Sequence, residues 1–288
     1  MPELPEVETV RRGLLSSLEG HVVTHVLARR PDLRFPLPEH FRERLEGARV
    51  LHLRRRAKYM LAELSTGETL VMHLGMTGRF EVEDRPGSIN APGAFALNGS
   101  TAPKHAHVVL ETDAGRRLTY FDARRFGFMG LIRSDKLTEH PWFKGMGPEP
   151  LGPEFTAAAL GDALKNRQQA IKTLLLDQRI VAGLGNIYVC EALWRAGISP
   201  LRAGGKVSRP KLAALVEAVR AVLEEAIEAG GSTLRDFQAA DGSLGYFQHR
   251  FQAYGREDEP CLRPGCRGVI RRKAQGGRST FYCPVHQT

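Results

Sequence analysis

The apolar positions in the first half of the chain follow two different periods. Over residues 5–18, Val7, Val10, Leu14 and Leu18 recur at helical spacing, so this segment is predicted to be an amphipathic helix. Behind it come short β-like runs separated by Gly, Pro and Asp turn signals. The predicted strands cover residues 21–28, 48–53, 59–63, 69–74, 79–83, 107–111, 117–121 and 129–133. Their hairpin-like spacing predicts an antiparallel sandwich or barrel.

Helical spacing returns in the second half of the chain. The predicted helices cover residues 156–165, 168–177, 186–195 and 210–229, and Thr156 is a good N-cap for the first. A glycine-rich turn at 181–185 joins the second helix to the third, which is the pattern of a helix-turn-helix element. The third helix begins at Asn186, where unpaired N–H groups and a side-chain amide can meet a phosphate. An ordinary helical hairpin explains the same spacing.

Changes in composition mark the expected domain boundaries. Residues 134–154 are rich in Pro and Gly and have no clear period, so we interpret them as a linker. We therefore expect an α+β chain with a β-sandwich domain at 1–133, a helical domain at 155–250 and a cysteine-containing domain at 251–288. Residues 84–103 are predicted to form a long loop, and residues 236–246 a loop suited to covering a pocket.

The net charge narrows the class of partner. The chain has 288 residues with 41 Lys and Arg against 32 Asp and Glu, a formal charge of +9. Such a surplus favours a polyanion, most often nucleic acid. The N-terminus lacks an apolar signal segment, and no apolar run reaches the length of a membrane span. We therefore expect a cytoplasmic protein with no membrane partner, and a monomer is the default.

Four residues near the end of the chain have the spacing of metal ligands. Cys261 and Cys266 form a C-x4-C pair, and Cys283 and His286 form a C-x2-H pair after sixteen intervening residues. This is the order of a zinc ribbon, in which two ligand turns pin a basic β-hairpin, and Cys3His is an accepted structural zinc set. In a reducing compartment, ligands explain these thiols better than disulfides do. We expect one structural Zn2+ here and a buried thiol at Cys190.

The second residue is a candidate nucleophile. Removal of Met1 would leave Pro2 with a free secondary amine beside the carboxylic acid of Glu3. An α-amine has a pKa of about 8, against about 10.4 for lysine, so a fair fraction is unprotonated at neutral pH. A secondary amine can form an iminium with a sugar aldehyde carbon without first losing a proton, which is covalent catalysis by an amine. Pro2 also fits the simple start of a helix, where a missing N–H costs nothing.

Three polar clusters interrupt the strand pattern. They are residues 54–58 (RRRAK), 104–107 (KHAH) and 122–127 (DARRFG). The first two are predicted basic turns, and a solvated hairpin explains the first equally simply. In the third, Arg124 and Arg125 can contact phosphates beside the flat ring of Phe126, which can enter a base stack and hold a duplex kinked. A core aromatic that caps the sheet is the alternative for Phe126.

A methionine occupies the glycine-flanked turn at residues 73–78 (HLGMTG). Methionine usually fills a gap in the core. The flanking glycines favour exposure of Met76 at a loop tip, where an unbranched apolar side chain can replace an extruded base.

Taken together, these residues closely resemble the formamidopyrimidine-DNA glycosylase family. The resemblance runs the length of the chain and rests on the segments PELPEVETVRRGL, RRAKY, HLGMTG, KHAH, DARRFG, IKTLLLDQRIVAGLGNIY, YGR and GRSTFYC. It implies a bifunctional enzyme of base excision repair that removes oxidised purines from duplex DNA and cleaves the strand by β,δ-elimination. It also implies a β-sandwich catalytic domain followed by a helix–two-turn–helix domain with a zinc-finger β-hairpin.

The resemblance also implies roles for individual residues. Pro2 is expected to attack the anomeric carbon, Glu3 to act as the acid or base that opens the deoxyribose ring, and Lys58 to assist catalysis or contact the lesion. The expected void-filling residues are Met76, Arg124, which faces the orphaned cytosine, and Phe126. Arg278 is expected among the catalytic residues, where it forms with Asn186 the phosphate clamp that pinches the duplex at the lesion. The other expected contacts to DNA are Arg125, His73 and His105, and Glu6 is expected in the base pocket.

The sequence departs from the family pattern in three places. The first knuckle of the finger is C-x4-C rather than C-x2-C, and His286 replaces the last cysteine. Ala106 stands where an acidic residue is expected. The loop at 84–103 is longer than usual.

Three alternative functions explain less of the sequence. Sister glycosylases of the endonuclease VIII type, which prefer oxidised pyrimidines, usually open PEGPE and lack the Met, Arg and Phe set. An architectural DNA-binding protein needs none of Pro2, Glu3 and Lys58. A small-molecule enzyme with an N-terminal proline base leaves the finger and the basic loops unexplained.

Overall fold

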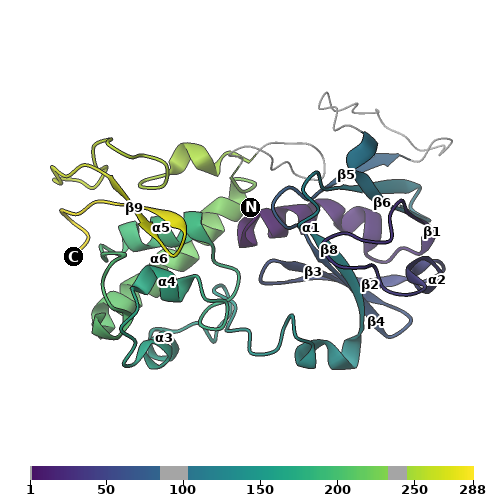
Figure 1. The fold of residues 1–288 in the computed structure, drawn as a ribbon, viewed down its shortest axis with the longest axis horizontal. Coiled ribbons are helices and arrows are strands. Elements are labelled where there is room, and N and C mark those ends of the chain that lie inside the picture. The colour runs from purple at the N-terminus through teal and green to yellow at the C-terminus, as the bar shows by residue number, and fades with distance from the viewer. Residues whose placement is uncertain (1, 85–102, 233–244) are drawn as a thin grey trace. The chain divides into compact units, whose positions relative to one another are not determined.

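The computed structural model describes residues 2–84, 103–232 and 245–288 (Figure 1). The chain forms two compact units, one of Met1–Lys144 with Gly230–Gly245 and one of Gly145–Ala229 with Tyr246–Thr288. The first unit thus takes up a segment from late in the chain. The loops predicted at 84–103 and 236–246 lie almost wholly outside the described residues.

Helix α1 (Leu4–Leu18) begins the first unit. Glu3 is its N-cap, and Glu3 and Glu6 form a capping box in which each side chain accepts the other's backbone N–H. The apolar face predicted from the sequence, which includes Val10 and Leu14, is buried. The predicted helix is confirmed and begins one residue earlier than expected.

All eight predicted strands are present, and they form two four-stranded antiparallel sheets (Figure 1). The sheet orders are β1-β6-β7-β5 and β2-β3-β4-β8. The strands are β1 (Val23–Ala28), β2 (Val50–Arg56), β3 (Tyr59–Leu64), β4 (Glu68–His73), β5 (Arg79–Asp84), β6 (Ala106–Thr112), β7 (Arg116–Phe121) and β8 (Phe128–Arg133). Buried side chains of α1 and of both sheets share one core, which confirms the sandwich.

Short elements were missed or misplaced by the sequence pattern. Helix α2 (Phe41–Leu45) and the 3-10 helices η1 (Pro103–His105) and η2 (Ser134–Glu139) span too few residues to show a period. The predicted basic turn at 54–58 is wrong for its first three residues, because they continue β2 and only residues 57 and 58 turn. An edge strand tolerates such charges on its open face. The predicted turn at 104–107 is likewise half strand, since β6 begins at its third residue.

The second unit contains the predicted helices and hairpin. Helix α5 (Asn186–Arg195) has the predicted bounds, and Thr156 caps α3 by accepting the N–H of Ala159 at 3.1 Å. Helix α4 is shorter than predicted because Ala170, its N-cap, has a non-helical ψ of 137°. The other elements are α3 (Ala157–Leu164), α4 (Ile171–Leu175), η3 (Gly204–Lys206), α6 (Arg209–Glu228), η4 (Phe247–Arg250), β9 (Arg271–Gln275) and β10 (Arg278–Tyr282).

The hairpin of β9 and β10 turns through Gly276 and Gly277, both of which have positive φ. Behind it, Phe281 and Ile270 share a small apolar core with Trp194 at the end of α5. The finger is thus packed against the helical part of the second unit.

Candidate functional site

Two loops of the first unit cross between the sheets side by side. Residues 74–78 lead from β4 to β5, and residues 122–127 lead from β7 to β8. We call these two segments the crossing loops. Because β4 pairs with β8 and β5 pairs with β7, each end of one loop adjoins a strand that is paired with a strand of the other loop. They touch: a Cβ added to Gly75 would lie 2.3 Å from the nitrogen of Gly127.

The crossing loops present apolar side chains to solvent. Met76 is 36% exposed and Phe126 is 42% exposed, so neither is a core residue. The guanidinium of Arg124 lies 4.6 Å from the centre of the Phe126 ring, a cation–π contact that holds the two side chains together. The neighbouring Arg125 has a positive φ of 53° and lies 3.6 Å from the carboxylate of Asp32.

An open pocket of ≈ 450 Å³ adjoins the second crossing loop. Its walls include Asp32 and Arg34, two residues that the sequence did not indicate. The N–H of Arg34 donates to the carbonyl of Gly127 at 3.0 Å, which fixes the segment against the loop. Arg34 precedes a segment that contains two prolines, and nothing in this sequence pattern predicts a role in a site. The backbone hydrogen bond to Gly127 brings this arginine to the pocket that Arg124 and Arg125 also line.

The candidate nucleophile lies at the start of α1. Pro2 is buried and Glu3 is only 3% exposed. Both carboxylate oxygens of Glu6 accept backbone N–H groups at 2.8 Å, one from Glu3 and the other from Ser232. Glu6 therefore fixes the position of Glu3, which follows Pro2 directly.

Lys58 lies in the turn between β2 and β3, and His73 ends the neighbouring strand β4. Burial, together with the positive charges of Lys58 and Arg34, lowers the pKa of His73 to about 4. Its Nδ1 accepts the N–H of Gly75 at 3.0 Å. His73 is therefore a neutral ring with its proton on Nε2, which makes it a hydrogen-bond donor at neutral pH.

Replacing His73 by asparagine is expected to make the fold less sensitive to acid. The pKa of His73 in the folded chain lies below the ordinary 6.5, so the unfolded chain binds the proton more readily. The stability from the neutral ring is complete above pH 6.5 and is lost as the pH falls toward about 4. Asparagine keeps an acceptor for Gly75 and does not titrate.

Thermal unfolding midpoints across this range test the His73 prediction. The midpoint should fall less steeply with pH in the variant than in the wild type. His52→Asn, at an exposed position of β2, is the matched control and should keep the wild-type profile. An unchanged slope in His73→Asn would contradict the assignment of a neutral ring.

In the second unit, Asn186 and the start of β10 are in direct contact. The side-chain amide of Asn186 donates to the carbonyl of Ser279 at 2.9 Å, and its Oδ1 is buried without a hydrogen-bond partner among the described residues. Buried Lys172 of α4 donates to the same carbonyl at 3.0 Å and to the hydroxyl of Thr280 at 2.7 Å. These bonds place exposed Arg278 beside the first turn of α5. Lys172 was not predicted, because a lysine within an apolar helix usually marks its solvent face.

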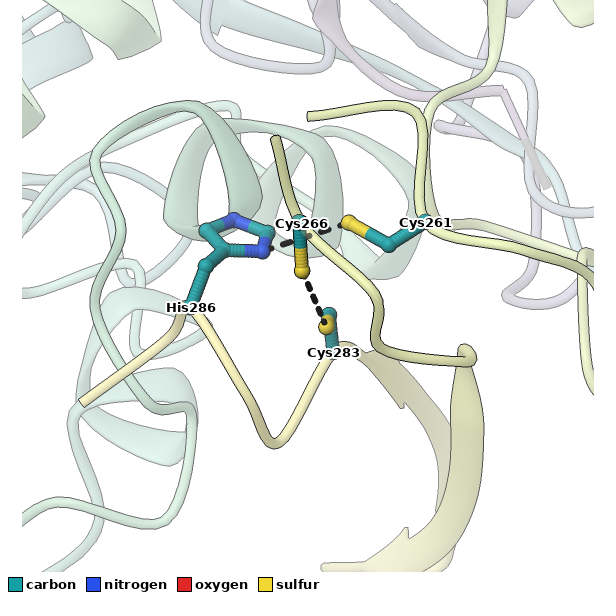
Figure 2. A group of neighbouring side chains, drawn as sticks. All are labelled: Cys261, Cys266, Cys283 and His286. Atoms are coloured by element: carbon teal, nitrogen blue, oxygen red, sulfur yellow. Dashed lines mark hydrogen bonds between the residues drawn. The ribbon is translucent and has the colours of Figure 1, made fainter. Parts of the chain in front are cut away.

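The four predicted metal ligands converge in the finger, as Figure 2 shows. One ligand atom from each of them lies within 4.8 Å of the others. The Sγ atoms of Cys266 and Cys283 are 3.7 Å apart, and Cys261 Sγ is 3.3 Å from Nδ1 of His286. These separations match the edges of a tetrahedron of sulfur and nitrogen ligands around zinc. The finger holds one structural zinc.

The histidine of the zinc group has a defined orientation. Nε2 of His286 lies 3.1 Å from the carbonyl oxygen of Trp194 and donates to it, so Nδ1 faces the metal. The histidine at the last ligand position thus ties the metal group to the end of α5. Cys190, in the middle of the same helix, is a buried thiol as predicted.

His105 lies in η1 and is half-buried. Its carbonyl accepts the N–H of Asp122 at 3.1 Å, which joins the KHAH segment to the second crossing loop. In the part of the chain that the structure describes, no helix is long and apolar enough to cross a bilayer.

Comparison with known proteins gives matches over the whole chain. Residues 1–129 match the formamidopyrimidine-DNA glycosylase N-terminal domain, residues 146–238 match its H2TH domain, and residues 258–285 match the zinc finger found in FPG and IleRS. Formamidopyrimidine-DNA glycosylases of Caulobacter vibrioides and Phenylobacterium zucineum are each 61% identical over 287 residues, with 100% of both chains covered.

Solved structures are similar over the same length. The MutM (Fpg) protein of Thermus thermophilus is 39% identical with a TM-score of 0.83, covering 99% of this chain and 98% of that chain. A mutant of Lactococcus lactis FPG, solved with DNA containing Fapy-dG, is 33% identical with a TM-score of 0.85, and 100% of both chains is covered.

Proposed function

The chain belongs to the formamidopyrimidine-DNA glycosylase family, and on that premise we propose that it removes oxidised purines from duplex DNA and then cleaves the strand. The observation that carries the proposal is full-length identity of 61% to curated glycosylases, with Pro2 and Glu3 at the start of α1. Related structures contain DNA with a Fapy-dG lesion or an abasic site, which supports damaged duplex DNA as the substrate.

We propose that Pro2 is the nucleophile. After removal of Met1, its nitrogen attacks the anomeric carbon, the glycosidic C–N bond breaks, and the base leaves with the bonding electrons and takes up a proton. The attacking nitrogen gives up its N–H proton, and the sugar ring opens when its oxygen is protonated, which leaves an iminium between Pro2 and the open sugar. Buried Glu3, held by Glu6, is the proposed acid for this step.

Strand cleavage follows from the same iminium. Loss of a proton from the carbon next to the iminium carbon lets the 3′ phosphate depart, and a second elimination lets the 5′ phosphate depart. Water then hydrolyses the iminium and frees Pro2. We propose that Lys58, whose charge reaches His73, assists these proton transfers beside the phosphates.

The void left by the extruded base needs a replacement. Extrusion costs a few kcal/mol, and less for a damaged base. Met76 and Phe126 are exposed on adjacent crossing loops, and Arg124 stacks on Phe126. We propose that these three side chains fill the void and that Arg124 faces the orphaned cytosine.

The proposed phosphate clamp lies in the second unit. Asn186, in the first turn of α5, donates to the carbonyl of Ser279, and exposed Arg278 is the preceding residue at the start of β10. A helix N-terminus and a guanidinium both favour a phosphate. His73, His105 and Arg125 are proposed as further contacts to DNA, and Glu6 as part of the base pocket.

Arg278→Ala is expected to weaken duplex binding and flatten its salt dependence. A lost phosphate contact lowers the magnitude of the slope of log affinity against log salt by about one. Fluorescence anisotropy at several salt concentrations measures this slope. The control is Arg42→Ala, which removes an exposed arginine of α2 that pairs with Glu46. Equal slopes for wild type and Arg278→Ala would contradict the phosphate contact.

Borohydride trapping tests the whole proposal. The substrate is a duplex with one 8-oxoguanine opposite cytosine, and the cross-link is located by mass mapping. An adduct on Pro2 supports the proposed glycosylase and lyase. A chain that lacks Met1, binds the duplex and gives no adduct would instead be a lesion-binding relative without the lyase step.

A further inference from the structure

Asp122 lies at the start of the second crossing loop and its side chain is fully buried. Its Oδ1 accepts the hydroxyl of Thr77 at 2.5 Å. Its Oδ2 accepts the N–H of Gly127 at 2.8 Å and the hydroxyl of Tyr120 at 3.3 Å. Thr77 belongs to the first crossing loop and Gly127 to the second, so one carboxylate binds both loops.

The backbone around Asp122 is held as firmly as its side chain. Its N–H donates to the carbonyl of His105 at 3.1 Å, and its carbonyl accepts from Nε2 of buried His107 at 2.8 Å. Thr77 extends the network, because its hydroxyl oxygen accepts the N–H of Arg124 at 3.2 Å. The main chain at Arg124 is thereby bonded to the residue that follows Met76.

A buried carboxylate makes this arrangement resistant to change. A charge removed from water is costly unless its hydrogen-bond capacity is filled, and hydrogen bonds in a low-dielectric interior are strong. Burial, together with the negative charge of Asp122, raises the pKa of Tyr120 well above its usual range, so its hydroxyl remains a donor. Displacing either crossing loop would take a partner from this buried charge. The loops are therefore expected to keep one shared arrangement.

We propose that Asp122 is a positioning residue that holds Met76, Arg124 and Phe126 in one arrangement, so that all three enter the duplex together. This inference rests on the void-filling role proposed above for the crossing loops. Side chains that are already in place need no ordering when the damaged base leaves the stack, and this favours the extruded state. Asp122 touches no reacting atom and acts only through the two loops.

Thr77→Val removes one of the loop contacts and keeps the side-chain volume. Excision of 8-oxoguanine in single turnover is expected to slow about tenfold. This is the effect expected when the extruded state loses one hydrogen bond to a buried charge. Cleavage at a preformed abasic site, from which no base must be extruded, should change by less than about twofold. The fluorescence of 2-aminopurine beside the orphaned cytosine, which rises when the stack opens, should rise more slowly.

Asp122→Asn tests the carboxylate itself. The asparagine amide has an oxygen on one side and an NH2 group on the other, so it cannot accept from both Thr77 and Gly127 unless one of these donors becomes an acceptor. We therefore expect slower excision with little change in cleavage at the abasic site. If Asp122→Asn fails to fold, Thr77→Val still decides the proposal.

Two comparisons separate positioning from general stability. Thr69→Val makes the same chemical change at the other end of β4, where the buried hydroxyl bonds Ser134 at 2.8 Å, and it should excise at the wild-type rate. Thr77→Val combined with Phe126→Ala should be no slower than Phe126→Ala alone, because both changes act through the same wedge. Slowing by Thr69→Val equal to that by Thr77→Val, or fully additive slowing in the double variant, would overturn the proposal.

The behaviour of the wild-type chain distinguishes the proposed function from the role of Asp122. A wild-type chain that opens the stack but excises no base contradicts the proposed function. A wild-type chain that excises 8-oxoguanine, with Thr77→Val and Asp122→Asn both at its rate, overturns only the role of Asp122.

Discussion

Pro2→Gly is expected to slow excision of 8-oxoguanine by roughly 10³-fold or more, the scale on which a covalent nucleophile contributes. Glycine at this position also provides a terminal amine, but a primary one whose position no ring fixes. The iminium that it forms can lose a proton and become an uncharged imine. Duplex affinity should change only a few-fold, because the variant keeps a terminal amine and Pro2 is buried ahead of the N-cap Glu3. Single-turnover excision and fluorescence anisotropy on the same duplex separate the two effects.

The matched control for this prediction is the next proline in the chain. Pro5 is also buried, but it lies within the first turn of α1. Pro5→Ala places a good helix former there and should retain the borohydride adduct on Pro2. If Pro2→Gly loses excision and duplex affinity by the same factor, the residue contributes to binding and the nucleophile assignment is wrong.

Cys283→Ala is expected to release the zinc and reduce duplex affinity by roughly 100-fold or more, since a small finger without its metal is unfolded and loses its phosphate contacts. Cys283 follows β10 directly and is fully buried beside Cys266. Loss of this ligand turn frees the strand that begins with Arg278. Zinc content by mass spectrometry and anisotropy on the lesion duplex measure the two outcomes.

Cys190→Ala is the control for the zinc prediction. This cysteine is buried in α5 and is not one of the four grouped ligands. The variant should keep one zinc per chain and the wild-type affinity. A Cys283→Ala protein that lacks zinc yet binds the duplex like the wild type would show that the finger is not needed for binding.

The regular part of the fold was predictable because each strand and helix shows its own period. Helix α5 and all eight strands of the sandwich were predicted to within a few residues at each end. The finger was predictable for a different reason: its ligands are few, chemically distinctive and close in sequence, so spacing alone brings them together.

What could not be predicted depends on pairing between distant segments. Nothing in the sequence links Thr77 to Asp122, because their contact arises only when β5 pairs with β7 and β4 with β8. Buried charges were missed for a related reason. A glutamate within a helix is expected to face solvent, but Glu191 is fully buried. Its carboxylate accepts the N–H groups of Gln252, Ala253 and Tyr254, and burial raises its pKa. Local periodicity contains no information about such partners.

The bond between Glu6 and Ser232 spans 226 positions of the chain. A ribosome that has translated both sheets of the sandwich has still to make the helices of the second unit before it reaches Ser232. Throughout that interval the carboxylate that fixes Glu3 lacks the N–H of Ser232. The end of the protein to which we assign the nucleophile therefore reaches its final form only after most of the polypeptide has been synthesised, although its residues are the first to be made.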